Sequence, residues 1–167
     1  MKQNILITGA GSGIGRASAR RIAKDMNVIV ADWNEEGAAE TVGMIEADGG
    51  TATAIQVDVS DSASVWSMKD RIGSDIGPVH KAFFAAGIFI RGVVGEIPED
   101  DWDRMIDIHV KGTFLGCQAV LPDMVDAGKG AIVNVASVAA FQPGPWMSSY
   151  YASKAYVLNF SEGLREE

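Results

Sequence analysis

The sequence has few cysteines and histidines and no long apolar run. Its 167 residues include one cysteine and two histidines, so an internal disulfide is impossible, and no Cys/His cluster has metal-ligand spacing. The longest apolar runs, such as NVIVA and AIVNVA, are far too short to cross a bilayer, and MKQNILITG is not a signal peptide. We therefore predict a cytoplasmic protein that binds no metal, with its single cysteine, Cys117, in the core.

Positive charge is also scarce. Lysine and arginine number 14 against 22 acidic residues, which gives a formal net charge of −8 without any basic stripe. Nucleic acid and anionic membrane are therefore poor partners. The hydrophobic fraction of 47% is sufficient for one globular domain. Since no linker, repeat or low-complexity segment interrupts the chain, we expect a single domain over residues 1–167.

Short β-branched runs alternate with longer stretches of helical spacing. The runs are NILIT, NVIVAD, ATAIQVDV, KAFFAAG and GAIVNVAS. Continuous apolar runs are typical of strands buried on both faces, so the pattern predicts an α/β fold with a doubly wound parallel sheet of about five strands. From Ser149 onward the spacing is helical to the end, and no further strand follows. A crossover helix normally leads to another parallel strand, so we expect C-terminal strands to be absent.

A glycine-rich turn follows the first expected strand. ILITGAGSGIGRA places Gly9, Gly11, Gly13 and Gly15 between this strand and a helix. A turn without side chains lets backbone N–H groups and the helix N-terminus approach a pyrophosphate, and the last glycine allows close helix packing. This position favours a dinucleotide site over a merely flexible turn.

The second expected strand ends at an acid, Asp32. A carboxylate at this place can accept hydrogen bonds from the adenosine ribose and would repel a 2′-phosphate. Neither Ser12 nor the residues after Asp32 supply a cation, so NAD is favoured over NADP. Asp32 could instead cap the helix that begins in NEEGAAE, and the two roles could be shared.

Two tyrosines precede a lysine in SSYYASKAY. Tyr150 and Tyr151 lie four and three residues before Lys154, so either could share a helix face with it, and spacing alone does not choose. An adjacent ammonium group favours a phenolate and suits the phenol to general acid/base catalysis on an alcohol or carbonyl oxygen. The alternative is a surface lysine lying along a tyrosine ring.

Taken in order, these segments resemble the short-chain dehydrogenase/reductase family. TGAGSGIG resembles its cofactor turn, DVSD its adenine-contacting segment and FAAG its NNAG motif, while NVASVAA and YYASK resemble its serine and Tyr-x-x-x-Lys. The family's serine precedes its tyrosine by a similar interval to that from Ser137 to Tyr150, which selects Tyr150 over Tyr151. The resemblance covers the whole chain. It implies a Rossmann-like fold, an NAD-dependent oxidoreductase that interconverts a secondary alcohol and a ketone, and a homodimer or homotetramer.

The resemblance also implies a role for each matching residue. Tyr150 would exchange the proton, Lys154 would favour its phenolate and hold the nicotinamide ribose, and Ser137 would hydrogen-bond the substrate oxygen, while hydride passes to or from the nicotinamide. The residues expected to contact NAD are Gly9, Ser12, Gly13, Ile14 and Gly15 at the pyrophosphate, Asp32 at the ribose, Asp58 and Val59 at the adenine, Ala85, Ala86 and Gly87 along the middle, and Tyr150 with Lys154.

The sequence departs from the family at three points. HVKG puts His109 where the family carries a water-holding asparagine. His109 lies on the apolar stripe of WDRMIDIHV, either as a core residue or as a relay group that titrates near neutral pH. FAAG lacks the two amides of NNAG, and the chain is shorter than family members.

The remaining segments bear on the substrate and on other functions. An apolar wall is expected from Phe89, Ile90, Phe141, Pro143, Trp146 and Met147. This wall favours a small apolar alcohol or ketone, although Arg91 could bind a carboxylate if it is not simply solvated. Two alternatives stay open: a nucleotide-binding module that senses or scaffolds without turnover, and a methyltransferase, in which Tyr150 and Lys154 would have no use.

Overall fold

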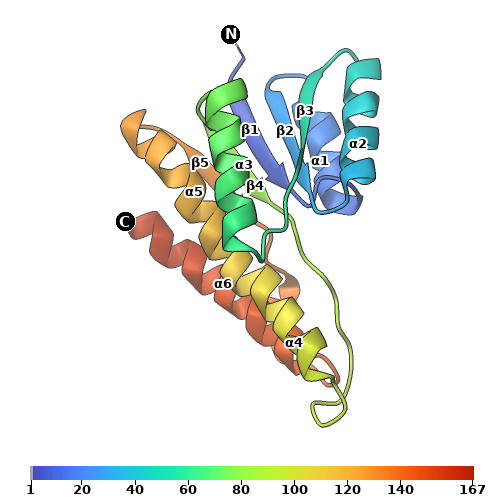
Figure 1. Ribbon diagram of the computed structural model, residues 1–167. Helices are drawn as coiled ribbons and strands as arrows, with labels where there is room; N and C mark the ends of the chain where they lie inside the picture. Colours follow the sequence, from blue (N-terminus) through green and yellow to red (C-terminus); the bar gives the residue numbers. More distant parts are fainter. Residues whose placement is uncertain (1) are drawn as a thin grey trace.

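A computed structural model describes residues 2–167 of the chain as one parallel sheet flanked by helices (Figure 1). The strands are β1 (Asn4–Thr8), β2 (Asn27–Asp32), β3 (Thr51–Gln56), β4 (Lys81–Phe84) and β5 (Ala131–Asn134). They are parallel throughout and lie in the order β3-β2-β1-β4-β5. The predicted α/β fold with a doubly wound parallel sheet is confirmed.

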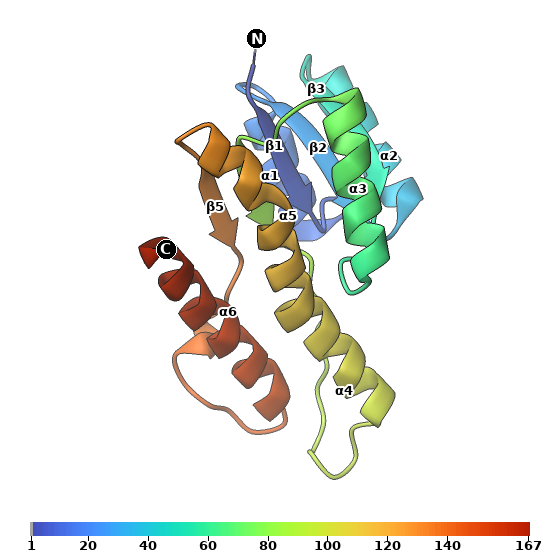
Figure 2. The ribbon, with the colours of Figure 1, turned by 60° about the vertical axis from the view of Figure 1, so that its left-hand side comes forward.

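Helices cover both faces of this sheet. α1 (Gly13–Ile22) and α2 (Glu35–Ala47) lie on one face, and α3 (Ser62–Asp75), α5 (Gly112–Asp126) and α6 (Ser148–Glu166) lie on the other (Figures 1 and 2). Within residues 2–167, no helix is both long and apolar enough to span a bilayer. Because the strand order changes direction between β1 and β4, the loops that follow these two strands border a crevice at the carboxyl edge of the sheet.

Burial differs sharply between central and edge strands. Every residue of β1 is buried, as is β2 after its first residue, because both strands have helices on each side and strands along each edge. In β3 and β5, which form the two edges, exposed residues alternate with partly buried ones, apart from the buried Ile55 in β3. The expectation of burial on both faces is therefore confirmed for β1 and β2 and wrong for the edge strands β3 and β5, where alternate residues are exposed, Val133 to 52%.

A π-helical turn joins α4 (Glu99–Ile106) to α5. It spans Asp107–Lys111, and the hydroxyl of Thr113 donates a 2.6 Å hydrogen bond to the carbonyl oxygen of His109 within it. Such turns change the direction in which side chains project and are frequent at functional sites. In this turn the His109 side chain projects into the interior. Cys117, on α5, lies in the core as predicted, and burial raises the pKa of its thiol to about 11.

Candidate active site

The glycine turn between β1 and α1 has no room for a side chain at Gly9 or Gly15. Gly9 has a φ of +66°, and a Cβ added there would lie 2.7 Å from the backbone nitrogen of Ala86 in the loop after β4. A Cβ added at Gly15 would overlap the carbonyl oxygen of Gly9. These glycines let the turn, the start of α1 and the β4 loop approach closely, which leaves a shallow backbone-lined cradle suited to a pyrophosphate.

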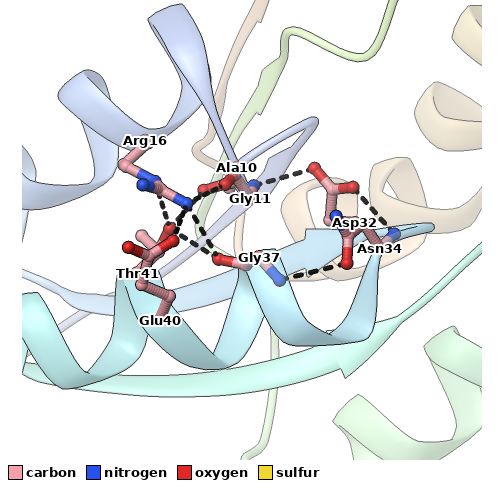
Figure 3. Close-up of polar contacts among 8 residues, drawn as sticks. All are labelled: Ala10, Gly11, Arg16, Asp32, Asn34, Gly37, Glu40 and Thr41. Atoms are coloured by element: carbon pink, nitrogen blue, oxygen red, sulfur yellow. Dashed lines mark hydrogen bonds and ion pairs between the residues drawn. The ribbon is translucent and has the colours of Figure 1, made fainter.

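A polar network joins this turn to α1 and α2 (Figure 3). The guanidinium of Arg16 donates to the carbonyl oxygen of Gly11, pairs with Glu40 at 2.7 Å and donates to Thr41 Oγ1 at 3.0 Å. The Thr41 hydroxyl, fully buried, lies 2.9 Å from the carbonyl oxygen of Ala10. The network fixes the turn to α2. The sequence pattern did not predict it, because its members come from two helices and only Arg16 adjoins the glycine motif.

Asp32 also fixes the turn. One carboxylate oxygen accepts from the backbone N–H of Gly11 at 2.8 Å, and the other accepts from the N–H of Asn34 at 2.9 Å (Figure 3). The helix cap is Asn34, whose side chain accepts from the N–H of Gly37 at 3.1 Å. The alternative in which Asp32 caps α2 is therefore wrong. Asp32 is 7% exposed, and its carboxylate borders the cavity described next.

A cavity of about 320 Å³ runs from the glycine turn to the loop after β4. The structure brings together around it the residues expected at the pyrophosphate, ribose, adenine and middle of the cofactor: Gly9, Ser12, Gly13, Ile14, Gly15, Asp32, Asp58, Val59, Ala85, Ala86 and Gly87. It adds others that the sequence analysis missed: Trp33, Val57, Ser60, Ile88, Arg104 and Ile108. Trp33 could have been found, since it adjoins Asp32, whereas no local pattern connects Arg104 on α4 with this cavity.

Gly87 connects this cavity to the predicted catalytic residues. A Cβ added at Gly87 would lie 3.1 Å from His109 Nε2 and 3.7 Å from Lys154 Nζ. Lys154 is buried on α6, and its ammonium group donates a 2.9 Å hydrogen bond to the carbonyl oxygen of Val135. Burial lowers the pKa of Lys154. The segment that follows β5 thus holds the lysine next to Gly87, although neither Lys154 nor Tyr150 lines the cavity itself.

Of the two tyrosines, Tyr150 is the one beside Lys154. Lys154 Nζ lies 6.0 Å from the centroid of the Tyr150 ring, which also meets Phe89 edge-on at 5.1 Å between centroids. The Tyr151 hydroxyl points elsewhere, because a Cβ added at Gly144 would lie 2.6 Å from it. This geometry agrees with the choice of Tyr150 that the family resemblance implies.

Ser137 follows β5 in extended conformation. Its hydroxyl accepts a 3.1 Å hydrogen bond from the N–H of Ala139 and so caps a short 3-10 helix, Val138–Ala140, that packs against α6. The hydroxyl hydrogen is not used by this bond, so it is available to a ligand. No metal-ligand cluster of His, Cys, Asp or Glu occurs within the described part of the chain.

His109 is buried as the apolar stripe predicted, at 1% exposure. Its Nε2 accepts from the N–H of Ile88 at 3.0 Å, and its Nδ1 lies 2.8 Å from Ser153 Oγ, whose hydroxyl donates to the carbonyl oxygen of Tyr150 at 2.8 Å. This chain of bonds requires a neutral ring protonated at Nδ1. Burial and the charge of Lys154 lower the pKa of His109 to about 4, so the hypothesis of a titration near neutral pH is wrong.

The expected substrate wall is open. The side chains of Phe89, Phe141 and Trp146 are exposed; Phe89 packs edge-on against Tyr150, whereas Phe141 and Trp146 lie in the loop before α6. The Arg91 guanidinium lies over the Trp146 ring, 5.3 Å from its centroid, and the N–H of Gly92 donates to the carbonyl oxygen of Trp146 at 2.8 Å. The loops after β4 and before α6 are therefore joined at this point.

Comparison with known proteins assigns the chain to a family. A family model described as short chain dehydrogenase matches residues 3–167. The chain belongs to the short-chain dehydrogenase family. This membership removes the support for the methyltransferase alternative, because the glycine turn and Asp32 now have a family context in which Tyr150 and Lys154 also fit.

Three similar proteins illustrate the relationship. D-threitol dehydrogenase of Mycolicibacterium smegmatis is 38% identical over 163 residues, which cover 97% of this chain and 63% of that protein. A short-chain dehydrogenase/reductase of Burkholderia phymatum solved with NAD is 36% identical with a TM-score of 0.93, covering 98% and 59%. Actinorhodin polyketide ketoreductase solved with NADPH is 30% identical with a TM-score of 0.94, covering 98% and 64%. The chain thus spans about three fifths of these relatives.

Proposed function

We propose that this chain forms the NAD-binding and catalytic part of an oxidoreductase that interconverts a secondary alcohol and a ketone. The observation that carries the proposal is the junction at Gly87. There, the cavity lined by the glycine turn and Asp32 reaches Gly87, which lies next to Lys154, and the Lys154 ammonium group lies beside the Tyr150 ring. A dinucleotide in this cavity would bring its nicotinamide to Tyr150, whose ring lies beside the lysine. Residues 1–167 act in this proposal as one dinucleotide-binding domain.

The preference for NAD rests on Asp32. Its carboxylate is 7% exposed, lines the cavity and is fixed by the N–H groups of Gly11 and Asn34. A carboxylate held in this way accepts hydrogen bonds from ribose hydroxyls and repels a 2′-phosphate. The relative from Burkholderia phymatum was solved with NAD, and the ketoreductase with NADPH, so the family fold accommodates both cofactors and local charge decides between them.

In this mechanism the chain moves a proton. The nicotinamide, when bound, supplies or accepts the hydride. In reduction the Tyr150 hydroxyl gives a proton to the carbonyl oxygen, and in oxidation the Tyr150 phenolate takes one from the alcohol, while the Ser137 hydroxyl hydrogen-bonds the same oxygen. Lys154 holds its positive charge beside the Tyr150 ring and, through Val135, fixes the ring's helix to the segment after β5. Because both its ring nitrogens are engaged, His109 positions α6 against the loop after β4 and takes no part in the proton transfer.

The proposal also includes a substrate class, an oligomeric state and a location. The exposed rings of Phe89 and Phe141 favour a small apolar alcohol or ketone, and the relative named D-threitol dehydrogenase indicates that polyols also deserve testing. Trp102 on α4 and Phe114 on α5 are exposed, which favours a homodimer or homotetramer through these helices. A cytoplasmic location and the absence of nucleic acid or membrane partners complete the proposal.

The two adjacent tyrosines provide a matched test. NADH binding is followed by energy transfer from tryptophan, and turnover is followed with NAD and a panel containing 2-butanol and D-threitol. We expect Tyr150→Phe to lower kcat by about 10²- to 10⁴-fold with NADH affinity retained, and Tyr151→Phe to retain turnover. If the wild-type chain binds NADH but turns over nothing, the silent binding module is favoured. If both variants keep turnover, Tyr150 is not the general acid/base.

A further inference from the structure

Two residues far apart in the sequence meet at one end of the cavity. Trp33 directly follows Asp32 at the end of β2, and Arg104 lies on α4. The Arg104 guanidinium carbon is 5.8 Å from the centroid of the Trp33 ring. Both residues line the same cavity as Asp32, Val59 and Ile108. The contact therefore links α4 to β2 across the cavity's rim.

Folding alone does not account for either side chain. The Trp33 side chain is 68% exposed, so its indole adds little to the core. Arg104 is the one cation of Glu99–Ile106, a helix that carries four acids. Even so, Arg104 forms no ion pair in the part of the chain that the structure describes, since no carboxylate oxygen there lies within 4.0 Å of its guanidinium nitrogens. Its charge is instead directed across the cavity's rim at the indole.

The chemistry of the pair suits a purine base. An exposed indole offers a flat aromatic face for stacking, and a guanidinium is planar, delocalised and weakly hydrated, so that it packs on aromatic rings. Val59 and Ile108 supply apolar surface in the same cavity. We propose that Trp33 and Arg104 form a clamp that binds the adenine base and closes this end of the cavity. The clamp rests on the proposed function, because it requires that the cavity bind a dinucleotide.

Another role for Arg104 predicts a different result. A cation near the adenosine ribose could pair with the 2′-phosphate of NADPH. The position of the guanidinium over an indole, together with the Asp32 carboxylate in the same cavity, favours contact with the base. Binding affinities distinguish the two roles. If Arg104 contacts the base, its loss weakens every ligand that contains adenine; if it contacts a 2′-phosphate, its loss weakens NADPH alone.

Calorimetric titration of four ligands tests the clamp. The ligands are NADH, NADPH, 5′-AMP and nicotinamide mononucleotide, and the variants are Trp33→Leu and Arg104→Gln. Arg91→Gln is the matched control, because Arg91 also lies over an indole, that of Trp146, while neither residue lines this cavity. Trp33, Arg104 and Arg91 are exposed, so unchanged thermal unfolding midpoints are expected for all three variants.

The clamp predicts a loss confined to the adenine ligands. Trp33→Leu should weaken NADH and 5′-AMP by about 5- to 150-fold, the range that base stacking on an aromatic side chain spans. Arg104→Gln should weaken both ligands by about 3- to 10-fold. Nicotinamide mononucleotide should bind equally to all variants, and Arg91→Gln should match the wild-type chain throughout.

Three results would overturn the inference, each in a distinguishable way. A loss of NADPH affinity alone in Arg104→Gln would assign the guanidinium to a 2′-phosphate. Unchanged NADH and 5′-AMP affinities in both variants would show that the contact has no role in binding, while the proposed function would stand. A folded wild-type chain that binds neither NADH nor 5′-AMP would contradict both the clamp and the proposed function.

Discussion

The two ends of the site rest on differently packed parts of the sheet. The cofactor end follows β1 and β2, whose side chains are buried by helices on both faces. The reacting end follows β5, an edge strand in which exposed and partly buried residues alternate. There, polar contacts such as the 2.9 Å bond from the Asn134 side chain to Ser161 Oγ join the strand to α6. Core packing thus supports the strands beneath the cradle, whereas hydrogen bonds join β5 and the segment after it to α6, which carries the proposed proton donor.

The largest effect is expected where the cofactor end has no spare space. In Gly15→Ala, the added Cβ would overlap the backbone oxygen of Gly9. Because neither backbone segment can shift cheaply within a buried turn, we expect this variant to lose NADH binding and much of its stability. Circular dichroism with thermal unfolding and an NADH titration measure both. A stable Gly15→Ala chain with wild-type NADH affinity would contradict the claim that the cofactor end is tightly packed, since the turn would then shift to accept a Cβ.

The histidine that joins the two ends should make stability depend on pH. The pKa of His109 is about 4 in the folded chain and about 6.5 when unfolded, so the unfolded state binds more protons between these values. Stability therefore rises with pH across this window, and about 3 kcal/mol is lost as pH falls from 6.5 to 4. Urea unfolding at a series of pH values measures the loss. His109→Asn should show a shallower slope, and an unchanged slope would contradict the assignment.

The same substitution in the two regions provides a direct comparison. Val30 in β2 is fully buried, and Val133 in β5 is 52% exposed. Val30→Ala should lower the free energy of unfolding by about 2–3 kcal/mol, from lost burial and the cavity left behind, and Val133→Ala by less than about 1 kcal/mol. Urea unfolding of the pair gives both values. Equal losses would mean that β5 is as tightly packed as β2.

The smallest effect is a stabilising one, away from both ends. Gly43 lies within α2, and a Cβ added there would meet no atom within 4 Å. Gly43→Ala should therefore raise the free energy of unfolding by about 0.5–1 kcal/mol and leave NADH affinity unchanged. It is the matched control for Gly15→Ala in the same assays. A destabilised Gly43→Ala chain would show that loss of stability at a glycine is not specific to the turn.

The sequence predicted the elements and motifs better than the contacts between them. All five strands and the parallel sheet follow from apolar runs, and the residues expected around NAD, apart from Tyr150 and Lys154, line one cavity, because local motifs end up at the same sheet edge in this topology. The Arg16 network and the Arg104 contact could not be predicted, since each joins elements distant in sequence. The solvation of His109 also depends on tertiary packing, which is why its titration was predicted wrongly.

Amide hydrogen exchange of the wild-type chain, with and without NADH, tests the central claim most directly. Without NADH, peptides from β1 and β2 should exchange slowest and β5 fastest among the strands. With NADH, protection should increase at residues 9–15, 31–33 and 85–88. Exchange in β5 as slow as in β1, or NADH protection absent from residues 9–15, would contradict the claim that a tightly packed cofactor end supports a loosely held reacting end.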